Sequence, residues 1–137
     1  MSSRQRLLFT PFKIGNITVK NRIVFSAHLT NYAEDFLPRE RHLYYYGERA
    51  RGGVGLIITE EQSTHPTDHP YEKLIHAFHR RVIPHYKRIT AAVHAEGVPI
   101  LAQINHNGGQ GSGMFTRLPA WAPSALADPL FREGAKA

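Results

Sequence analysis

Two continuous apolar runs, each preceded by a helical pattern, limit the fold of this chain more than any other feature. Val54–Thr59 reads VGLIIT and Pro99–Asn105 reads PILAQIN. Short runs of this kind, rich in β-branched residues, are typical of strands that are covered on both faces. Because helical patterns alternate with them, the strands are expected to be parallel and joined by helical crossovers. The sequence therefore predicts an α/β fold.

The two helical patterns have recognisable ends. Pro38 suits the first turn of one helix, and Gly52–Gly53 ends it. The second helix has Pro84 in its opening turn and Gly97 after its last turn. Each helix has one apolar face, formed in the first by Leu43, Gly47 and Ala50 and in the second by Val82, Tyr86, Ile89 and Val93.

The remaining segments complete the order of elements. Gly15–Asn16 predicts a tight hairpin turn, and Arg22–Ser26 predicts a further short strand. Glu61–Lys73 is polar and indicates a long loop, and the stretch from Gly108 to Ala137 has no clear period. The alternation fits either an open doubly wound sheet or the first part of a (β/α)8 barrel. In both, chemistry gathers at the carboxyl ends of the strands. The residues there are Ser26–Thr30, Thr59–Glu61 and Gln103–His106.

Composition limits the partners. The chain has 137 residues, a net charge of +6 and a pI near 9.9, but its cations are scattered along the sequence. We therefore expect no specific nucleic-acid binding. No apolar run approaches the ~18–20 residues of a membrane span, so we expect a soluble protein with no membrane partner. With no cysteine, the chain forms no disulfide, and we expect a cytoplasmic location.

Glycines and histidines suggest two further kinds of site. Gly108, Gly109, Gly111 and Gly113 do not fit a dinucleotide fingerprint or a phosphate-binding Gly-Lys-Ser/Thr loop, and a flexible rim loop is the simpler interpretation. The nine histidines lack the spacing of metal ligands. His76 and His79 could share a helix face, but no carboxylate stands at a matching turn. We therefore predict no metal site.

Gln103 is the most informative polar residue, because it lies near the end of an otherwise apolar strand. A buried primary amide without partners costs about 1–3 kcal/mol, so it needs both a donor and an acceptor. Neighbouring backbone groups could provide them. So could the pyrimidine edge of a flavin, which presents a carbonyl oxygen beside a ring N–H.

Several separate motifs occur in order along nearly the whole chain. They are Leu8-Phe9-x-Pro11, Ile14-Gly15, Lys20-Asn21-Arg22-Ile23-Val24, Tyr46-x-Glu48-Arg49-Ala50-x-Gly52-Gly53-Val54-Gly55-Leu56-Ile57, Val93-His94-Ala95-Glu96-Gly97, Gln103-Ile104-x-His106-x-Gly108 and Ala122-Pro123-Ser124-Ala125. Together they resemble the old yellow enzyme family of FMN-dependent oxidoreductases. The closer branch is similar to the 2,4-dienoyl-CoA reductases, because Ser26–Thr30 differs from the Pro-Met pair common elsewhere in the family.

This resemblance implies roles for individual residues. Gln103 would bind the pyrimidine edge of FMN, and Glu61 would stand at a flavin contact where the family usually has a small residue. Asn31 and His106 would line the mouth of the substrate site. The segment that would lie along the flavin, partly through backbone groups, consists of Ser26, Ala27, His28 and Leu29.

The resemblance also implies an activity and a whole domain. NADH or NADPH would reduce FMN, and the flavin would pass hydride to an activated alkene or enoyl substrate. A (β/α)8 barrel takes about 250 residues. The sequence therefore predicts one partial FMN-binding barrel domain over residues 1–137, with three βα units, an N-terminal hairpin and a rim loop from about residue 107.

Such an incomplete barrel is expected to be inactive alone, with its catalytic residues beyond residue 137. It would be completed in a homo-oligomer or by a complementing chain. The alternative is a non-catalytic barrel fragment or interaction module whose open edge pairs with a partner.

Overall fold

The computed structural model describes residues 3–129 and 134–137. A short helix α1 (Ser3–Leu8) comes first, followed by a hairpin of strands β1 (Phe12–Ile14) and β2 (Ile17–Val19). The pairing of Ile14 with Ile17 leaves a two-residue turn, and Gly15 has a φ of 58° there. The predicted hairpin is therefore confirmed, and glycine tolerates the positive φ that the turn requires. Helix α1 was not predicted.

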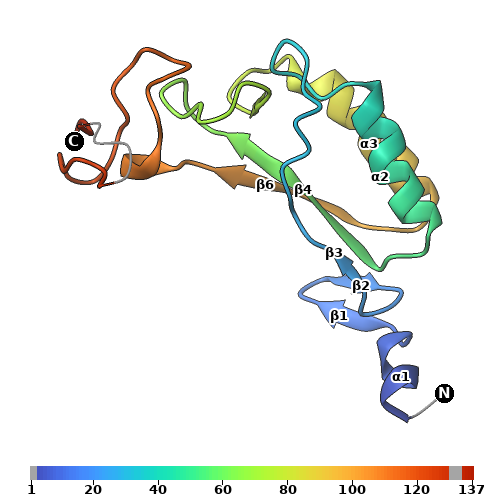
Figure 1. The fold of residues 1–137 in the computed structure, drawn as a ribbon. Coiled ribbons are helices and arrows are strands. Elements are labelled where there is room, and N and C mark those ends of the chain that lie inside the picture. Colours follow the sequence, from blue (N-terminus) through green and yellow to red (C-terminus); the bar gives the residue numbers. More distant parts are fainter. Residues whose placement is uncertain (1–2, 130–133) are drawn as a thin grey trace.

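A parallel sheet forms the centre of the molecule (Figure 1). Strand β4 (Leu56–Ser63) lies in its middle. Strands β3 (Val24–Phe25) and β5 (Ile75–His76) pair with one edge of β4, and β6 (Ile100–Asn105) pairs with the other. Since all these pairs are parallel, the carboxyl ends of the strands meet at one edge of the sheet.

Helices α2 (Glu40–Arg51) and α3 (Val82–Ala95) pack side by side on one face of the sheet (Figure 1). Gly52 and Gly53 end α2, and Gly97 follows α3 with a φ of 66°, as the sequence predicts. The core between the two layers consists of Tyr46, Ala50, Ile57, Ile89, Val93 and Val98. Its central strand residue, Ile57, is completely buried, as expected from the continuous run VGLIIT.

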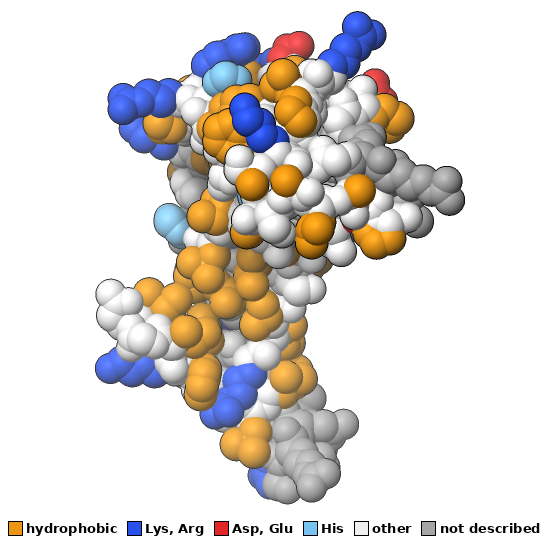
Figure 2. Space-filling model, turned by 90° about the vertical axis from the view of Figure 1, so that its left-hand side faces the viewer, with side chains coloured by type: hydrophobic (Ala, Val, Ile, Leu, Met, Phe, Trp, Pro, Cys, Tyr) orange, Lys and Arg blue, Asp and Glu red, His pale blue; other side chains and the backbone are white. Residues whose placement is uncertain are grey.

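The opposite face of the sheet is open. Val24 of β3 and Leu101 of β6 are 47% and 48% exposed on it. Figure 2 shows hydrophobic side chains gathered at the height of the sheet, between the hairpin below and the C-terminal segment above. Among the described residues, β6 pairs with no strand other than β4. No helix in the described part of the chain has the length and apolar character needed to cross a membrane.

The elements differ from the sequence analysis in three places. The strand predicted over Arg22–Ser26 is only two residues long. Strand β4 continues through Ser63, into the segment predicted as a loop from Glu61, because β5 and β6 pair with its second half. His76 and His79 share no helix face, since His76 lies in β5 and α3 begins at Val82.

Candidate functional site

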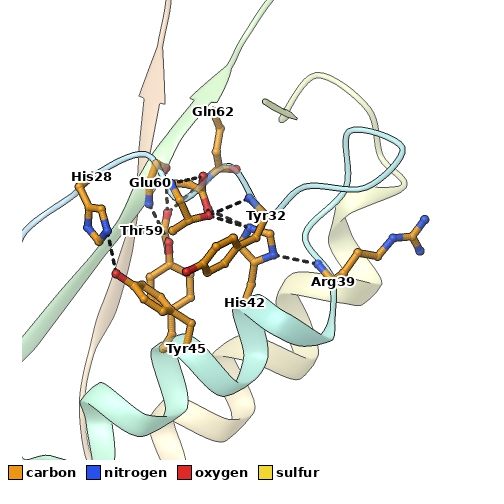
Figure 3. A network of polar contacts seen from close by, with 10 residues as sticks. His28, Tyr32, Arg39, His42, Tyr45, Thr59, Glu60 and Gln62 are labelled. Carbon is orange, nitrogen blue, oxygen red and sulfur yellow. Dashed lines mark hydrogen bonds and ion pairs between the residues drawn. The ribbon is translucent and has the colours of Figure 1, made fainter. Parts of the chain in front are cut away.

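The carboxylate of Glu60 is the centre of a buried polar network between β4, helix α2 and the segment after β3 (Figure 3). The Nε2 atom of His42 lies 2.8 Å from Oε1 of Glu60, and both side chains are fully buried. The hydroxyl of Thr30 donates to the same oxygen over 2.6 Å, and the Thr30 backbone N–H donates to Oε2 over 3.0 Å. The carboxylate thus accepts hydrogen bonds on both oxygens.

The hydrogen bond at the second ring nitrogen of His42, Nδ1, shows which nitrogen carries the hydrogen. The backbone N–H of Arg39 donates to Nδ1 over 3.1 Å, so Nε2 carries the hydrogen and donates to Glu60. The backbone N–H of Glu60 donates in turn to the hydroxyl of Tyr46 over 2.9 Å. Burial raises the pKa of Tyr46, which remains a neutral phenol. His42 and Tyr46 of α2 therefore fix the position of Glu60 on β4, and Glu60 in turn binds Thr30.

This network holds the segment after β3 against the sheet. Ser26 is exposed, and Ala27 and Leu29 are half-buried at the carboxyl end of the strand. The side chain of His28 contacts Tyr45 of α2, with Nε2 2.7 Å from the phenol oxygen (Figure 3). The imidazole of His28 is therefore engaged with the helix, and a ligand at the strand ends would meet residue 28 through its backbone.

Gln103 faces the open side of the sheet. Ile100 packs into the helix-side core, so by strand alternation Leu101, Gln103 and Asn105 point to the opposite face. Gln103 is exposed there, and its amide makes no hydrogen bond to another described residue. Neighbouring backbone groups therefore do not satisfy the Gln103 amide, as one of the two interpretations of this glutamine required.

Glu61 lies directly opposite Gln103 in the β4–β6 pair. The register shifts between Ile58 and Glu61, so this part of β4 carries one extra residue and Glu61 shares the open face with Ile58. The side-chain amide of Asn105 donates to Oε2 of Glu61 over 2.6 Å. Burial and then the charge of Asp68 raise the pKa of Glu61, while the hydrogen bond from Asn105 opposes that shift.

Asn31 and His106 line two different cavities. His106 borders one of about 700 Å³, together with Trp121, Pro123 and Lys136. Asn31 borders one of about 500 Å³ that also contains Tyr71 and Phe115. The structure therefore does not bring these two residues together in one cavity. Among the described residues, no group of three His, Asp or Glu side chains is placed to hold a metal ion.

The sequence pattern of the NADH:flavin oxidoreductase / NADH oxidase family matches residues 7–134. The chain belongs to this family. It is 35% identical over 133 residues to the N,N-dimethylglycine/sarcosine dehydrogenase of Chromohalobacter salexigens, a match that covers 94% of the chain and 19% of that protein. It is 30% identical to the multifunctional alkene reductase/demethylase of Caballeronia cordobensis, over 91% of the chain and 19% of that protein.

A solved structure of the family agrees with the fold. The old yellow enzyme homologue of Zymomonas mobilis superposes with a TM-score of 0.84 and 28% identity, over 95% of this chain and 39% of that one. The prediction of the N-terminal portion of a (β/α)8 barrel is therefore confirmed. The chain spans about a fifth of the length of the curated relatives named above. The finer placement in the 2,4-dienoyl-CoA reductase-like branch stays a prediction.

Family members use FMN and NAD(P)H, as the resemblance implied. The described residues fit an FMN group at the carboxyl edge of the sheet, because the exposed amide of Gln103 offers both a donor and an acceptor. Sequence reasoning missed His42 and the roles of Thr30 and Glu60 in the buried network. One signal was present in the sequence: His42 falls four residues before Tyr46, on the helix face that the structure buries.

Proposed function

We propose that this chain forms the flavin-binding part of an FMN-dependent NAD(P)H oxidoreductase of the ene-reductase type. When bound, FMN would supply hydride transfer from NAD(P)H to an activated alkene or enoyl substrate. One observation carries the proposal. In a chain of this family, the free amide of Gln103 lies on the open face, toward the edge of the sheet where β3 ends and the segment after it begins.

The residue roles follow from this placement. Gln103 would bind the pyrimidine edge of FMN. Ser26, Ala27, His28 and Leu29 would lie along the flavin, with His28 contributing backbone groups because its ring contacts Tyr45. Glu61 would stand beside Gln103 at the flavin. Asn31 and His106 would contact substrate from separate cavities at the mouth.

The open face implies a partner surface. Val24 and Leu101 are too exposed for the interior of a finished barrel, and β6 has a free edge within the described part of the chain. We propose that further barrel strands cover this face and provide the catalytic groups. They would come from a longer chain, a second copy or a complementing chain. The open face by itself would also suit the alternative, a non-catalytic module that binds a partner.

A second candidate function is oxidation of a methylated amine. Glu61 favours it, since a carboxylate replaces a small residue at the flavin contact implied by the family resemblance and would suit a cationic substrate. Two relatives are named as a dimethylglycine/sarcosine dehydrogenase and as an alkene reductase/demethylase. When bound, FMN would supply the oxidant for a C–H bond next to nitrogen, and Glu61 would hold the cationic amine. The overall products would be a dealkylated amine and an aldehyde, with water as co-substrate and an external electron acceptor as the final oxidant.

Replacement of Gln103 by alanine tests the flavin site. In the purified flavoprotein that contains this chain, we expect Q103A to weaken FMN binding about tenfold, because two hydrogen bonds to the pyrimidine edge are lost. Flavin fluorescence during titration measures the dissociation constant. Gln110→Ala, which removes an exposed amide from the loop after β6, is the matched control. Equal FMN affinity in Q103A and Q110A would contradict the proposal.

A further inference from the structure

The carboxylate of Glu61 lies at the centre of the open face near the carboxyl edge of the sheet. Glu61 of β4 pairs with Gln103 of β6, and Asn105 is the next residue of β6 on the same face. The Asn105 amide donates to Oε2 of Glu61. The described residues form no hydrogen bond to Oε1 of Glu61. One oxygen of the carboxylate is thus fixed, and the other is available to a ligand.

Negative charge around Glu61 has no cationic counterpart in the described structure. Asp68 is 1% exposed and close enough that its charge raises the pKa of Glu61 after burial. Asn107 donates twice to Oδ1 of Asp68, through its backbone and side-chain nitrogens. The buried Oδ2 atom of Asp68 has no hydrogen-bond partner. Ion pairs between described residues involve neither of these two carboxylates.

This charge distribution is unusual for a chain with a net charge of +6. Uncompensated carboxylates in a partly desolvated site attract a cation and disfavour an anion. The described part of the chain contains no group of three side chains that could bind a metal ion. An organic cation therefore fits the site better than a metal ion. A neutral alkene carries no charge to match these carboxylates.

We propose that Glu61 is a specificity-determining residue that binds the ammonium group of a secondary or tertiary alkylamine substrate. Oε1 accepts a hydrogen bond from the protonated nitrogen, while Asn105 holds Oε2. Asp68 adds negative charge behind this contact. The inference rests on the second candidate function, FMN-dependent oxidation of a methylated amine, and names Glu61 as the residue that recognises the cationic substrate.

Paired ligands of equal shape test the charge contact. N,N-dimethylglycine has an ammonium group where isovalerate has a CH group, and both have a carboxylate. In the purified flavoprotein that contains this chain, calorimetric titration gives the two dissociation constants, and the shift of the flavin absorption band on binding gives them independently. We expect the wild-type protein to bind the amine at least about tenfold more tightly than isovalerate, and E61Q to bind the two about equally.

Glu96→Gln is the matched control, because it removes the same charge from an exposed position after α3. It should retain the preference for the amine. A wild-type protein without that preference, or an E61Q protein that keeps it, would overturn the assignment of Glu61. Since calorimetry needs no flavin signal, a protein that binds no FMN would contradict the proposed function, while the ratio of dissociation constants would still decide the role of Glu61.

Discussion

Glu60 and His42 form a contact of 2.8 Å in which neither side chain is exposed to solvent. The contact joins the middle of β4 to the first turns of α2, and Thr30 adds the segment after β3 to the same carboxylate. A buried carboxylate is costly unless hydrogen bonds compensate for the lost water. The three donors on Glu60 provide that compensation, and they make the position of the candidate flavin segment depend on the helix.

Replacing Glu60 by glutamine should lower the free energy of unfolding by about 1–3 kcal/mol. Both carboxylate oxygens accept hydrogen bonds from Thr30, and His42 donates to one of them. A glutamine amide keeps one acceptor and turns the other into a donor that faces an N–H or O–H group. Urea unfolding measures the change, and E96Q is expected to stay within about 0.5 kcal/mol of the wild type. Similar losses in both variants would show that the network does not contribute.

Removal of the Tyr46 hydroxyl should also destabilise the protein. The backbone N–H of Glu60 donates to this oxygen, so Tyr46→Phe leaves a buried N–H without a partner. We expect a loss of about 1–3 kcal/mol in the free energy of unfolding. Tyr44→Phe on the same helix is the control, because Tyr44 is 59% exposed, and it should have little effect. Equal stability of Y46F and Y44F would contradict the role assigned to the Tyr46 hydroxyl.

Much of the fold could be predicted because its signals are local. The run around Ile57 is continuous and β-branched, and glycines end both long helices, so strand type and helix ends are encoded in a few neighbouring residues. The sequence predicts a loop from Glu61 because Glu61, Gln62 and Ser63 are polar, although all three belong to β4. Their strand conformation depends on pairing with β6 and on hydrogen bonds from distant residues, which override local preference.

The candidate site also has one part that the sequence could predict and one part that it could not. Gln103 could be selected because an amide in an apolar strand stands out in the sequence itself. Thr30 and His42 lie 30 and 18 residues before Glu60, and no spacing rule links residues across such intervals. The two-residue strand β5 is likewise too short to produce a period that could be recognised.

Gly55 should not tolerate alanine. A Cβ atom there would lie 2.2 Å from the backbone oxygen of Asn21 and 2.6 Å from its side-chain oxygen. Asn21 cannot move easily, because its amide donates to the Gly53 oxygen over 2.7 Å. We expect G55A to lower the free energy of unfolding by about 1–3 kcal/mol through overpacking. Thermal or urea unfolding measures this loss.

The matched control for Gly55 has the opposite expected sign. Gly47 lies within α2, and a Cβ atom there would have no neighbour within 4 Å. Gly47→Ala should therefore stabilise the protein by about 0.5–1 kcal/mol, since alanine loses less backbone entropy in a helix. Destabilisation of the two variants to the same extent would mean that the contact with Asn21 is not the cause.

Stability should fall in mild acid because of His76. Its ring stacks on Phe36 at 4.2 Å and lies close to Phe78, and its Nε2 atom is buried without a partner. Burial, followed by the charges of His69 and His79, lowers the pKa of His76 to about 4. The unfolded chain, with an ordinary histidine pKa near 6.5, therefore binds more protons than the folded protein between these two values. The free energy of unfolding must then decrease as the pH falls from about 6.5 toward 4.

A phenylalanine at position 76 should remove this part of the acid sensitivity, because it keeps the aromatic stacking but cannot be protonated. Between pH 7 and pH 4.5, we expect wild-type protein to lose about 1–2 kcal/mol more than His76→Phe. Urea unfolding at several pH values measures the difference. His94→Gln removes an exposed histidine and should follow the wild-type curve. If His76→Phe and wild type lose stability in parallel, the folded protein accommodates a charged His76, and its neighbours do not disfavour protonation as the structure indicates.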